Sequence, residues 1–331
     1  MVAVHSTARG PSLGGCRMWT YGDSRAAIKD ALRLSRAMTF KSAVAGLPLG
    51  GGKGVITLPA GDPPPAGDQR RDVLLDFGDT VASLGGAYIT AEDVGTSDRD
   101  MAVIAEVTER VAGLAVESGG SGDPSPWTAL GVRCAMEVAC ERAFGTPSLE
   151  RRSVSVVGLG RVGAKLARML AEAGAELVVA DVDDGKRAIA DELGARWTDP
   201  ESALRAEVDV VAPCALGGAF DDDSVPALHC RVIAGAANNQ LAADAIAVQL
   251  AERGIVWAPD FVANAGGIIN ISVELEPGGY DAVRAEARVR GVADTTRTLL
   301  DHADATGATP LAAAMEIARR RLAEARARAA A

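Results

Sequence analysis

The second half of the chain shows a regular pattern of apolar and polar positions. Short apolar runs at 154–157 and 177–180 alternate with segments in which apolar residues recur at helical spacing. Further short buried strands are predicted at 208–212, 232–234 and 255–257. Strands that alternate with helices are typical of a parallel, doubly wound sheet. The predicted fold class is therefore α/β.

The first half of the chain is less regular. Its pattern predicts strands at 1–5, 54–58 and 88–90, helices at 24–38 and 70–84, and a loop at 10–15. The stretch Gly-Gly-Ser-Gly-Asp-Pro-Ser-Pro at 119–126 is the best candidate for a linker. A chain of 331 residues is expected to form two domains. We therefore place the boundary between them after residue 124.

Composition and charge exclude several classes of protein. The chain has 34 Lys plus Arg against 44 Asp plus Glu, and the net charge of −10 argues against a general binder of nucleic acid or anionic membranes. Five scattered cysteines predict neither a disulfide framework nor a metal site, and they suit the reducing cytoplasm. The sequence contains no signal-peptide pattern and no apolar run of about 20 residues, so no membrane span is expected.

A glycine motif directly follows the predicted strand at 154–157. Residues 158–163 read Gly-Leu-Gly-Arg-Val-Gly, which is G-x-G-x-x-G between a strand and a helix. The first glycine permits a tight turn, the second lets the backbone approach a pyrophosphate, and the third lets the helix pack on the strand. The helix N-terminus then favours the anion. The sequence predicts a Rossmann-type dinucleotide site with contacts from Gly158, Gly160, Arg161, Val162 and Gly163.

An acidic residue ends the next predicted strand. Asp181 lies 21 residues after Gly160, where an acid can accept hydrogen bonds from the ribose hydroxyls of the cofactor. A carboxylate there repels the additional phosphate of NADP, so NAD is the predicted cofactor. The nearby Lys186 and Arg187 leave NADP open.

Two lysines flank a glycine-rich segment. Lys41 ends Met-Thr-Phe-Lys and Lys53 ends Leu-Gly-Gly-Gly-Lys. Glycines 50–52 would be costly in a regular element, so we expect the backbone there to approach a ligand closely. A second ammonium group and burial both lower the pKa of a lysine, which can then act as a general base while its partner binds a carboxylate. Asp93, in Ala-Glu-Asp-Val-Gly-Thr, is a candidate proton carrier beside them.

Motifs along nearly the whole chain, in the right order, resemble those of the amino acid dehydrogenases of glutamate, leucine, valine and phenylalanine. The matching stretches are 13–21, 38–41, 49–53, 90–96, 158–163, 212–218, 234–241 and 264–267. The resemblance implies reversible oxidative deamination of an L-amino acid to a 2-oxo acid and ammonia, with NAD accepting a hydride. It also implies a homo-oligomer.

The resemblance also implies domains and residue roles. Residues 1–124, joined by the C-terminal helix 300–331, would form the substrate-binding and oligomerisation domain, and 125–299 the NAD-binding domain. Lys41 would bind the substrate carboxylate, Lys53 would activate water, and Asp93 would relay a proton. Asn264 would contact the substrate. Further cofactor contacts would come from Thr128, Cys214, Ala215, Ala237 and Asn238.

The residues that the resemblance places around the substrate side chain are small or aliphatic. They are Leu13, Gly14, Ala91, Ile268 and Ile271. Glutamate would need a cation there, so a branched-chain substrate is predicted, closest to the leucine and valine enzymes. One or two methylene groups change binding by only about 1–3 kcal/mol, so Leu, Val and Ile are not separated. The sequence at 47–53 and an insertion at 59–67 look more like those of phenylalanine dehydrogenases. An aromatic amino acid dehydrogenase is therefore the alternative.

Two further hypotheses concern the class of protein and its N-terminus. A regulatory protein that binds NAD without catalysis would be expected to lose Lys41, Lys53 or Asp93, and all three are present. The family normally carries a helix and a strand before the position of Met1. Either the chain starts further upstream or it lacks an edge that relatives use in subunit contacts, so the oligomer size stays open.

Overall fold

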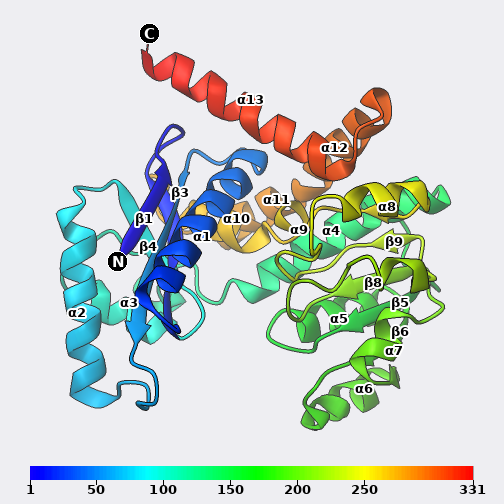
Figure 1. The fold of residues 1–331 in the computed structure, drawn as a ribbon, viewed down its shortest axis with the longest axis horizontal. Coiled ribbons are helices and arrows are strands. Elements are labelled where there is room, and N and C mark those ends of the chain that lie inside the picture. Colours follow the sequence, from blue (N-terminus) through cyan, green and yellow to red (C-terminus); the bar gives the residue numbers. More distant parts are fainter. Residues whose placement is uncertain (331) are drawn as a thin grey trace. The chain divides into compact units, whose positions relative to one another are not determined.

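The computed structural model describes residues 1–330, with side chains through residue 328. Contacts divide the chain into two compact units. Unit 1 comprises residues 1–124, 268–285 and those from 317 onward, and unit 2 comprises 125–267 and 286–316. Each unit contains a β-sheet covered by helices, which confirms the α/β class (Figure 1).

Unit 1 is built on a four-stranded sheet with the order β1-β3-β2-β4. Strand β1 runs antiparallel to β3, and the other neighbours are parallel. The elements are β1 (Val2–Ser6), β2 (Ser12–Thr20), α1 (Ser24–Val44), β3 (Gly50–Leu58), α2 (Gly67–Ser83), β4 (Tyr88–Glu92), α3 (Asp98–Ile104) and the 3₁₀ turn η1 (Val116–Ser118).

The two faces of this sheet have different partners. Val55 of β3 packs against Ala27 and Ala31 of α1 on one face. On the other face Tyr88 joins a cluster with Phe77 of α2 and further apolar side chains of α3. The sheet is thus buried on both sides, which explains why its strands are not simply alternating apolar and polar.

Two local predictions for this unit are wrong. The segment at 10–15 was expected to be a loop, but β2 begins at Ser12. Glycines 50–52 were expected outside regular structure, but they lie in β3. A Cβ atom at Gly51 would lie 2.1 Å from the backbone nitrogen of Thr39, and one at Gly52 would lie 2.6 Å from the ring of Tyr88. The glycines are therefore required by close packing within the protein.

A buried carboxylate fixes the start of α3. Asp100 accepts hydrogen bonds from Nε and Nη2 of Arg70, both at 2.7 Å, and from the backbone and hydroxyl of Ser97, the capping residue of α3. Burial would raise the pKa of Asp100, but the bonds from Arg70 and Ser97 outweigh it and hold that pKa below its usual value.

Replacing Asp100 by asparagine is expected to lower the free energy of unfolding by about 1–3 kcal/mol at pH 7, because bonds to a charged group are lost. A lowered folded-state pKa stabilises the fold above the unfolded pKa of about 4, and that contribution disappears as the pH falls through the folded value. Urea unfolding should therefore show that the variant is much less stable than wild type at pH 7. Near pH 3 the difference in free energy of unfolding between the two proteins should be small. Asp98→Asn, on the exposed side of the same turn, is the control. An equal difference at both pH values would contradict the assignment.

Unit 2 contains a six-stranded sheet in which every neighbouring pair is parallel, with the order β10-β9-β8-β5-β6-β7. Its elements are α4 (Ser125–Phe144), β5 (Ser153–Val157), α5 (Gly163–Glu172), β6 (Glu176–Ala180), η2 (Asp184–Lys186), α6 (Arg187–Leu193), β7 (Arg196–Trp197), α7 (Pro200–Leu204), β8 (Val210–Pro213), η3 (Val225–Ala227), β9 (Val232–Ile233), α8 (Ile246–Glu252), β10 (Val256–Trp257), α9 (Asp260–Ala263) and α12 (Val292–Thr306). Helices α10 (Gly266–Glu274), α11 (Ala282–Arg290) and α13 (Pro310–Ala330) each begin in one unit and end in the other.

The strand order of unit 2 reverses direction at β5. Strand β5 pairs with β6 on one side and with β8 on the other. In open α/β sheets, ligands bind at the carboxyl ends of the strands where the order reverses. The fold thus places the glycine motif, which directly follows β5, at the position where such a sheet binds a ligand.

Most of the unpredicted elements are short. The apolar pattern did not indicate β7, α3 or the helices from α7 to α12. Helix α7 has five residues and α9 has four, which is too few for a helical repeat to be recognised. Among the described helices, none combines the length and apolar character needed to cross a membrane.

Two arginines that are distant in sequence close the C-terminal end of α1. Arg321 of α13 donates to the carbonyl oxygens of Ala43 and Val44, at 3.1 and 2.5 Å. Arg9 donates to two carbonyls of the following turn, at 2.8 and 3.0 Å, and to the carbonyl of Arg321 at 3.3 Å. Carbonyls at a helix end have no partner within the helix, so these guanidinium groups satisfy them.

Candidate active site

The register of β2 and β3 decides which side chains share the face covered by α1. Val55 packs on α1, and Arg17 of β2 is paired with Val55. Side chains two residues apart on a strand point to the same face. Lys53 therefore lies on the same face as Val55, and Arg17 lies there as well.

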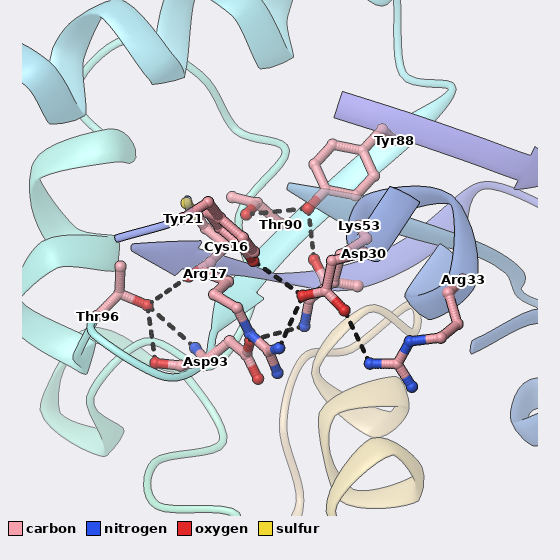
Figure 2. A network of polar contacts seen from close by, with 11 residues as sticks. Cys16, Arg17, Tyr21, Asp30, Arg33, Lys53, Tyr88, Thr90, Asp93 and Thr96 are labelled. Carbon is pink, nitrogen blue, oxygen red and sulfur yellow. Dashed lines mark hydrogen bonds and ion pairs between the residues drawn. The ribbon is translucent and has the colours of Figure 1, made fainter. Parts of the chain in front are cut away.

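The predicted catalytic pair is in direct contact. Nζ of Lys53 lies 2.7 Å from Oδ2 of Asp93, and only 6% of the Lys53 side chain is exposed. Nε of Arg17 lies 2.9 Å from the same carboxylate oxygen (Figure 2). The structure thus brings Lys53 and Asp93 together and adds a third charged group beside them.

A glycine and a turn position Asp93. Asp93 directly follows Glu92, the last residue of β4. A Cβ atom at Gly15 of β2 would lie 2.7 Å from Cβ of Asp93 and 2.6 Å from the carbonyl oxygen of Glu92. The backbone N–H of Asp93 donates to the hydroxyl of Thr96, and that hydroxyl donates to the carbonyl of Cys16. The missing side chain at Gly15 therefore lets this turn lie directly on β2.

The polar network continues into α1. Arg17 Nη1 lies 3.0 Å from Oδ2 of Asp30, which also accepts a hydrogen bond of 2.8 Å from the hydroxyl of Tyr21. Arg33 contacts the other oxygen of Asp30 at 2.7 Å. Figure 2 shows these side chains in one group between the sheet and α1. Positive and negative groups alternate from Lys53 outward.

The environment of the pair shifts both pKa values. Burial lowers the pKa of Lys53, since it disfavours the ammonium form; the charge of Asp93 opposes this effect and that of Arg17 adds to it. Burial alone would raise the pKa of Asp93, but Lys53 and Arg17 outweigh it and the pKa lies below its usual value. The carboxylate therefore stays ionised, and Lys53 is the member of the pair that can lose a proton below its ordinary pKa.

The residues predicted to contact the substrate side chain are buried in unit 1. Leu13 and Gly14 lie on β2, Ala91 lies on β4, and Ile268 and Ile271 lie on α10. None of these five residues carries a charge. Lys41 occupies the last turn of α1 and is half-buried.

The glycine motif of unit 2 has the geometry of a phosphate-binding turn. Gly158 has a φ of +102°, and a Cβ atom at Gly163 would lie 1.9 Å from the carbonyl oxygen of Gly158. At Gly160 an added Cβ would meet no atom within 4 Å. In the described structure the first turn of α5 receives no side-chain cap. The open position at Gly160 and the uncapped helix start fit a dinucleotide pyrophosphate.

The acid predicted to bind the ribose is held beside this turn. Asp181 directly follows β6, and its carboxylate accepts hydrogen bonds from the backbone of Leu159 at 2.6 Å and of Asp183 at 2.9 Å. These bonds fix the carboxylate next to the glycine motif. The residues present therefore fit the adenosine half of a nicotinamide cofactor.

The other predicted cofactor contacts lie nearby. Ala215 would touch a Cβ atom at Gly158, and the N–H of Cys214 donates to the last residue of β5 at 2.8 Å. The N–H of Ala237 donates to Pro213 at the end of β8. Cys214 and Ala215 thus follow β8, the neighbour of β5, and Ala237 follows β9, the next strand of the sheet.

Asn264 also lies in unit 2. Its Nδ2 donates to Oδ1 of Asn238 at 2.8 Å and to the carbonyl of Ala236 at 3.1 Å. Thr128 is in the first turn of α4, where a Cβ atom at Gly266 would lie 3.2 Å from its Cα atom. The segment that carries Asn264 is thereby packed against the start of α4.

Family models match both halves of the chain. The Glu/Leu/Phe/Val dehydrogenase dimerisation domain matches residues 1–110, and the Glutamate/Leucine/Phenylalanine/Valine dehydrogenase model matches 190–329. The NAD binding domain of D-isomer specific 2-hydroxyacid dehydrogenases matches 135–216. The fold and these matches define an oxidoreductase with a nicotinamide-binding domain. The chain belongs to the Glu/Leu/Phe/Val dehydrogenase family, as its motifs implied.

Individual relatives agree with this family. The chain is 46% identical to a leucine dehydrogenase of Bacillus subtilis, over 97% of this chain and 87% of the relative. It is also 46% identical to a valine dehydrogenase of Streptomyces virginiae, over 98% and 90% of the two chains. Among solved structures, L-tryptophan dehydrogenase from Nostoc punctiforme is 37% identical, with a TM-score of 0.83 over 98% of this chain and 91% of that one.

Sequence reasoning did not find the groups that surround Asp93. Arg17 and Tyr21 stand inside the motif at 13–21, but neither was given a role there, and Asp30 stands outside the motifs. A correct strand over 12–20 would have placed Arg17 on the same face as Lys53. The contact with Asp30 depends on how α1 lies on the sheet, which the linear pattern does not reveal.

Proposed function

We propose that this protein catalyses the reversible NAD-dependent oxidative deamination of a branched-chain L-amino acid to its 2-oxo acid and ammonia. The observation that carries the proposal is the buried ion pair of Lys53 and Asp93 in a chain of this family. Its leucine and valine dehydrogenase relatives support the reaction class and the choice of branched-chain substrates.

Lys53 acts as the general base in the proposed mechanism. Its lowered pKa gives a larger neutral fraction at the pH of the reaction than an exposed lysine has. Neutral Lys53 takes a proton from the water that attacks the carbon of the substrate imine. Asp93 carries a proton to and from the substrate nitrogen, and Lys41 binds the substrate carboxylate.

The glycine turn and Asp181 hold the dinucleotide in the proposal, with Thr128, Cys214, Ala215, Ala237 and Asn238 completing its contacts. When bound, the nicotinamide accepts a hydride from the substrate α-carbon. Asn264 contacts the substrate, and its bond to Asn238 limits the orientations that its amide can adopt.

The residues proposed to surround the substrate side chain select substrates by the size and polarity of that side chain. Leu13, Ala91, Ile268 and Ile271 offer apolar surface, so a carboxylate side chain such as that of glutamate would lose its hydration without a partner. An aromatic substrate remains the alternative, since residues 47–53 resemble the corresponding segment of phenylalanine dehydrogenases and the similar structure from Nostoc punctiforme is an L-tryptophan dehydrogenase.

The proposal is tested by NAD reduction with the purified protein at alkaline pH. Leu, Val and Ile are expected to be turned over faster than Phe, and Glu should give no measurable rate. Faster turnover of Phe would assign the aromatic alternative. Absence of turnover with every amino acid would contradict the proposed activity.

We expect NAD to be strongly preferred over NADP, because Asp181 repels the additional phosphate. Asp181→Asn keeps a hydrogen-bond acceptor but removes the charge. It should lower the ratio of kcat/KM for NAD to that for NADP about 10-fold or more, which corresponds to one lost charge contact. Asp183→Asn, an exposed neighbour, is the control. An unchanged ratio would mean that Asp181 does not determine the cofactor.

The proposed assembly and location follow from the family and the cysteines. The match of residues 1–110 to a dimerisation domain supports a homo-oligomer. The five cysteines are free thiols, which suits the reducing cytoplasm. Sedimentation of the purified protein would measure the oligomer size.

A further inference from the structure

We propose that Arg17 is a positioning residue for the reaction, which holds the Asp93 carboxylate against Lys53 and is itself held by Asp30. This inference rests on the proposed function, since it assigns the support of the same catalytic pair. It concerns residues to which the motifs assign no role. Figure 2 shows the groups involved.

Two cationic side chains determine the position of the Asp93 carboxylate. One oxygen of its carboxylate receives both Nζ of Lys53 at 2.7 Å and Nε of Arg17 at 2.9 Å. A planar guanidinium fixes a carboxylate in direction as well as in distance. Arg17 lies on β2, which pairs with both β3 and β4. It therefore determines where the Asp93 carboxylate lies when the proton of Lys53 leaves.

Arg17 is itself held in place by Asp30. Its Nη1 binds Asp30 at 3.0 Å, so two different carboxylates hold two different nitrogens of one guanidinium. Asp30 in turn is fixed by Tyr21 and Arg33. Both Arg17 and Asp30 are largely buried, with 22% and 17% of their side chains exposed. Such a network is more rigid than a single surface ion pair.

The charges of this network also affect the protonation of Lys53. Arg17 adds a positive charge beside Lys53, so it favours the neutral form of Lys53; Asp30 partly offsets that charge. The groups that face Lys53 or this network come from β2, α1 and the turn after β4: Cys16, Arg17, Tyr21, Asp30, Arg33 and Asp93. Burial raises the pKa of Cys16 and of Tyr21 to about 12, so both stay neutral in the working range.

Opposite changes are therefore expected from two substitutions. Arg17→Met should raise the pH at which Lys53 loses its proton, on the order of one pH unit. Asp30→Asn should lower it by a smaller amount. Arg17→Met should also reduce kcat about 10- to 100-fold with little change in KM, because a displaced proton carrier slows the chemical step. Arg17→Lys should restore the pH dependence but only part of kcat, because an ammonium group cannot bridge both carboxylates.

Two independent measurements test the inference. The first is the pH dependence of kcat/KM, whose rising limb reports the free base. The second is NMR of protein labelled with 13Cε-lysine, which follows the titration of Lys53 without turnover. The chain contains only five lysines, at positions 29, 41, 53, 165 and 186, so the signal can be assigned with Lys53→Arg. Arg25→Met is the matched control, because Arg25 is an exposed arginine of α1 outside this network.

The outcomes are distinct. Opposite shifts in Arg17→Met and Asp30→Asn, with none in Arg25→Met, support the inference. A Lys53 titration in folded Arg17→Met that equals that of wild type overturns it, even if stability falls, because Arg17 would then be only structural. A wild-type protein without turnover overturns the proposed function, while the NMR titration still decides whether Arg17 controls Lys53.

Discussion

Lys53→Met is expected to reduce turnover of the amino acid substrate at least about 100-fold, with the fold intact. Loss of a general base commonly costs a factor of 10² to 10⁴. Methionine retains an apolar stem of similar length in a position where only 6% of the lysine side chain is exposed, so packing changes little. Asp93 keeps a cationic partner, since Arg17 still binds it. The rate of NAD reduction at saturating substrate measures the loss.

The matched control is Lys29→Met, which removes an exposed lysine of α1 outside the network. It should leave kcat and KM within experimental error of wild type. Circular dichroism would verify that both variants are folded. Near wild-type turnover in folded Lys53→Met would show that the base has been assigned to the wrong residue.

The second large effect is expected on stability. Gly51→Ala should lower the free energy of unfolding by about 3 kcal/mol or more, or prevent folding. The new Cβ would lie 2.1 Å from the backbone nitrogen and 2.3 Å from Oγ1 of Thr39. The obstacle includes backbone, so α1 would have to move away from β3. Because α1 and β3 both contribute to the network around Lys53, activity should fall as well.

Thermal unfolding measures this effect, with an expected decrease in Tm of roughly 10 °C. Gly22→Ala is the control, since a Cβ atom there meets nothing within 4 Å. It should change Tm by no more than a degree or two. A Gly51→Ala protein as stable as wild type would mean that β3 and α1 can separate without cost.

The sequence predicted the parts whose signals are local. The strand and helix around the glycine motif were correct because G-x-G-x-x-G requires a specific turn, and Gly158 has the positive φ that such a turn needs. Lys53 and Asp93 were found as candidates from their motifs, and the structure places them in contact. Their catalytic roles stay predictions.

The errors arose where distant contacts decide the structure. Glycines 50–52 form a strand because α1 and β4 approach so closely that side chains do not fit, and no local propensity expresses that. The start of β2 was missed for the same reason, since Gly14 would place a Cβ atom 1.8 Å from the carbonyl oxygen of Gly52. Arg17 was not recognised because its partners, Asp30 and Asp93, are 13 and 76 residues away.

The arginine pair at the end of α1 has a consequence for biosynthesis. Arg9 and Arg321 are 312 positions apart, yet they bind the same helix terminus and each other. Until the last residues have been translated, the carbonyls of Ala43 and Val44 lack the guanidinium group of Arg321. Unit 1 therefore remains incomplete until α13 has been synthesised, although its first 124 residues leave the ribosome much earlier. Chaperone dependence during synthesis should accordingly be concentrated in the N-terminal segment.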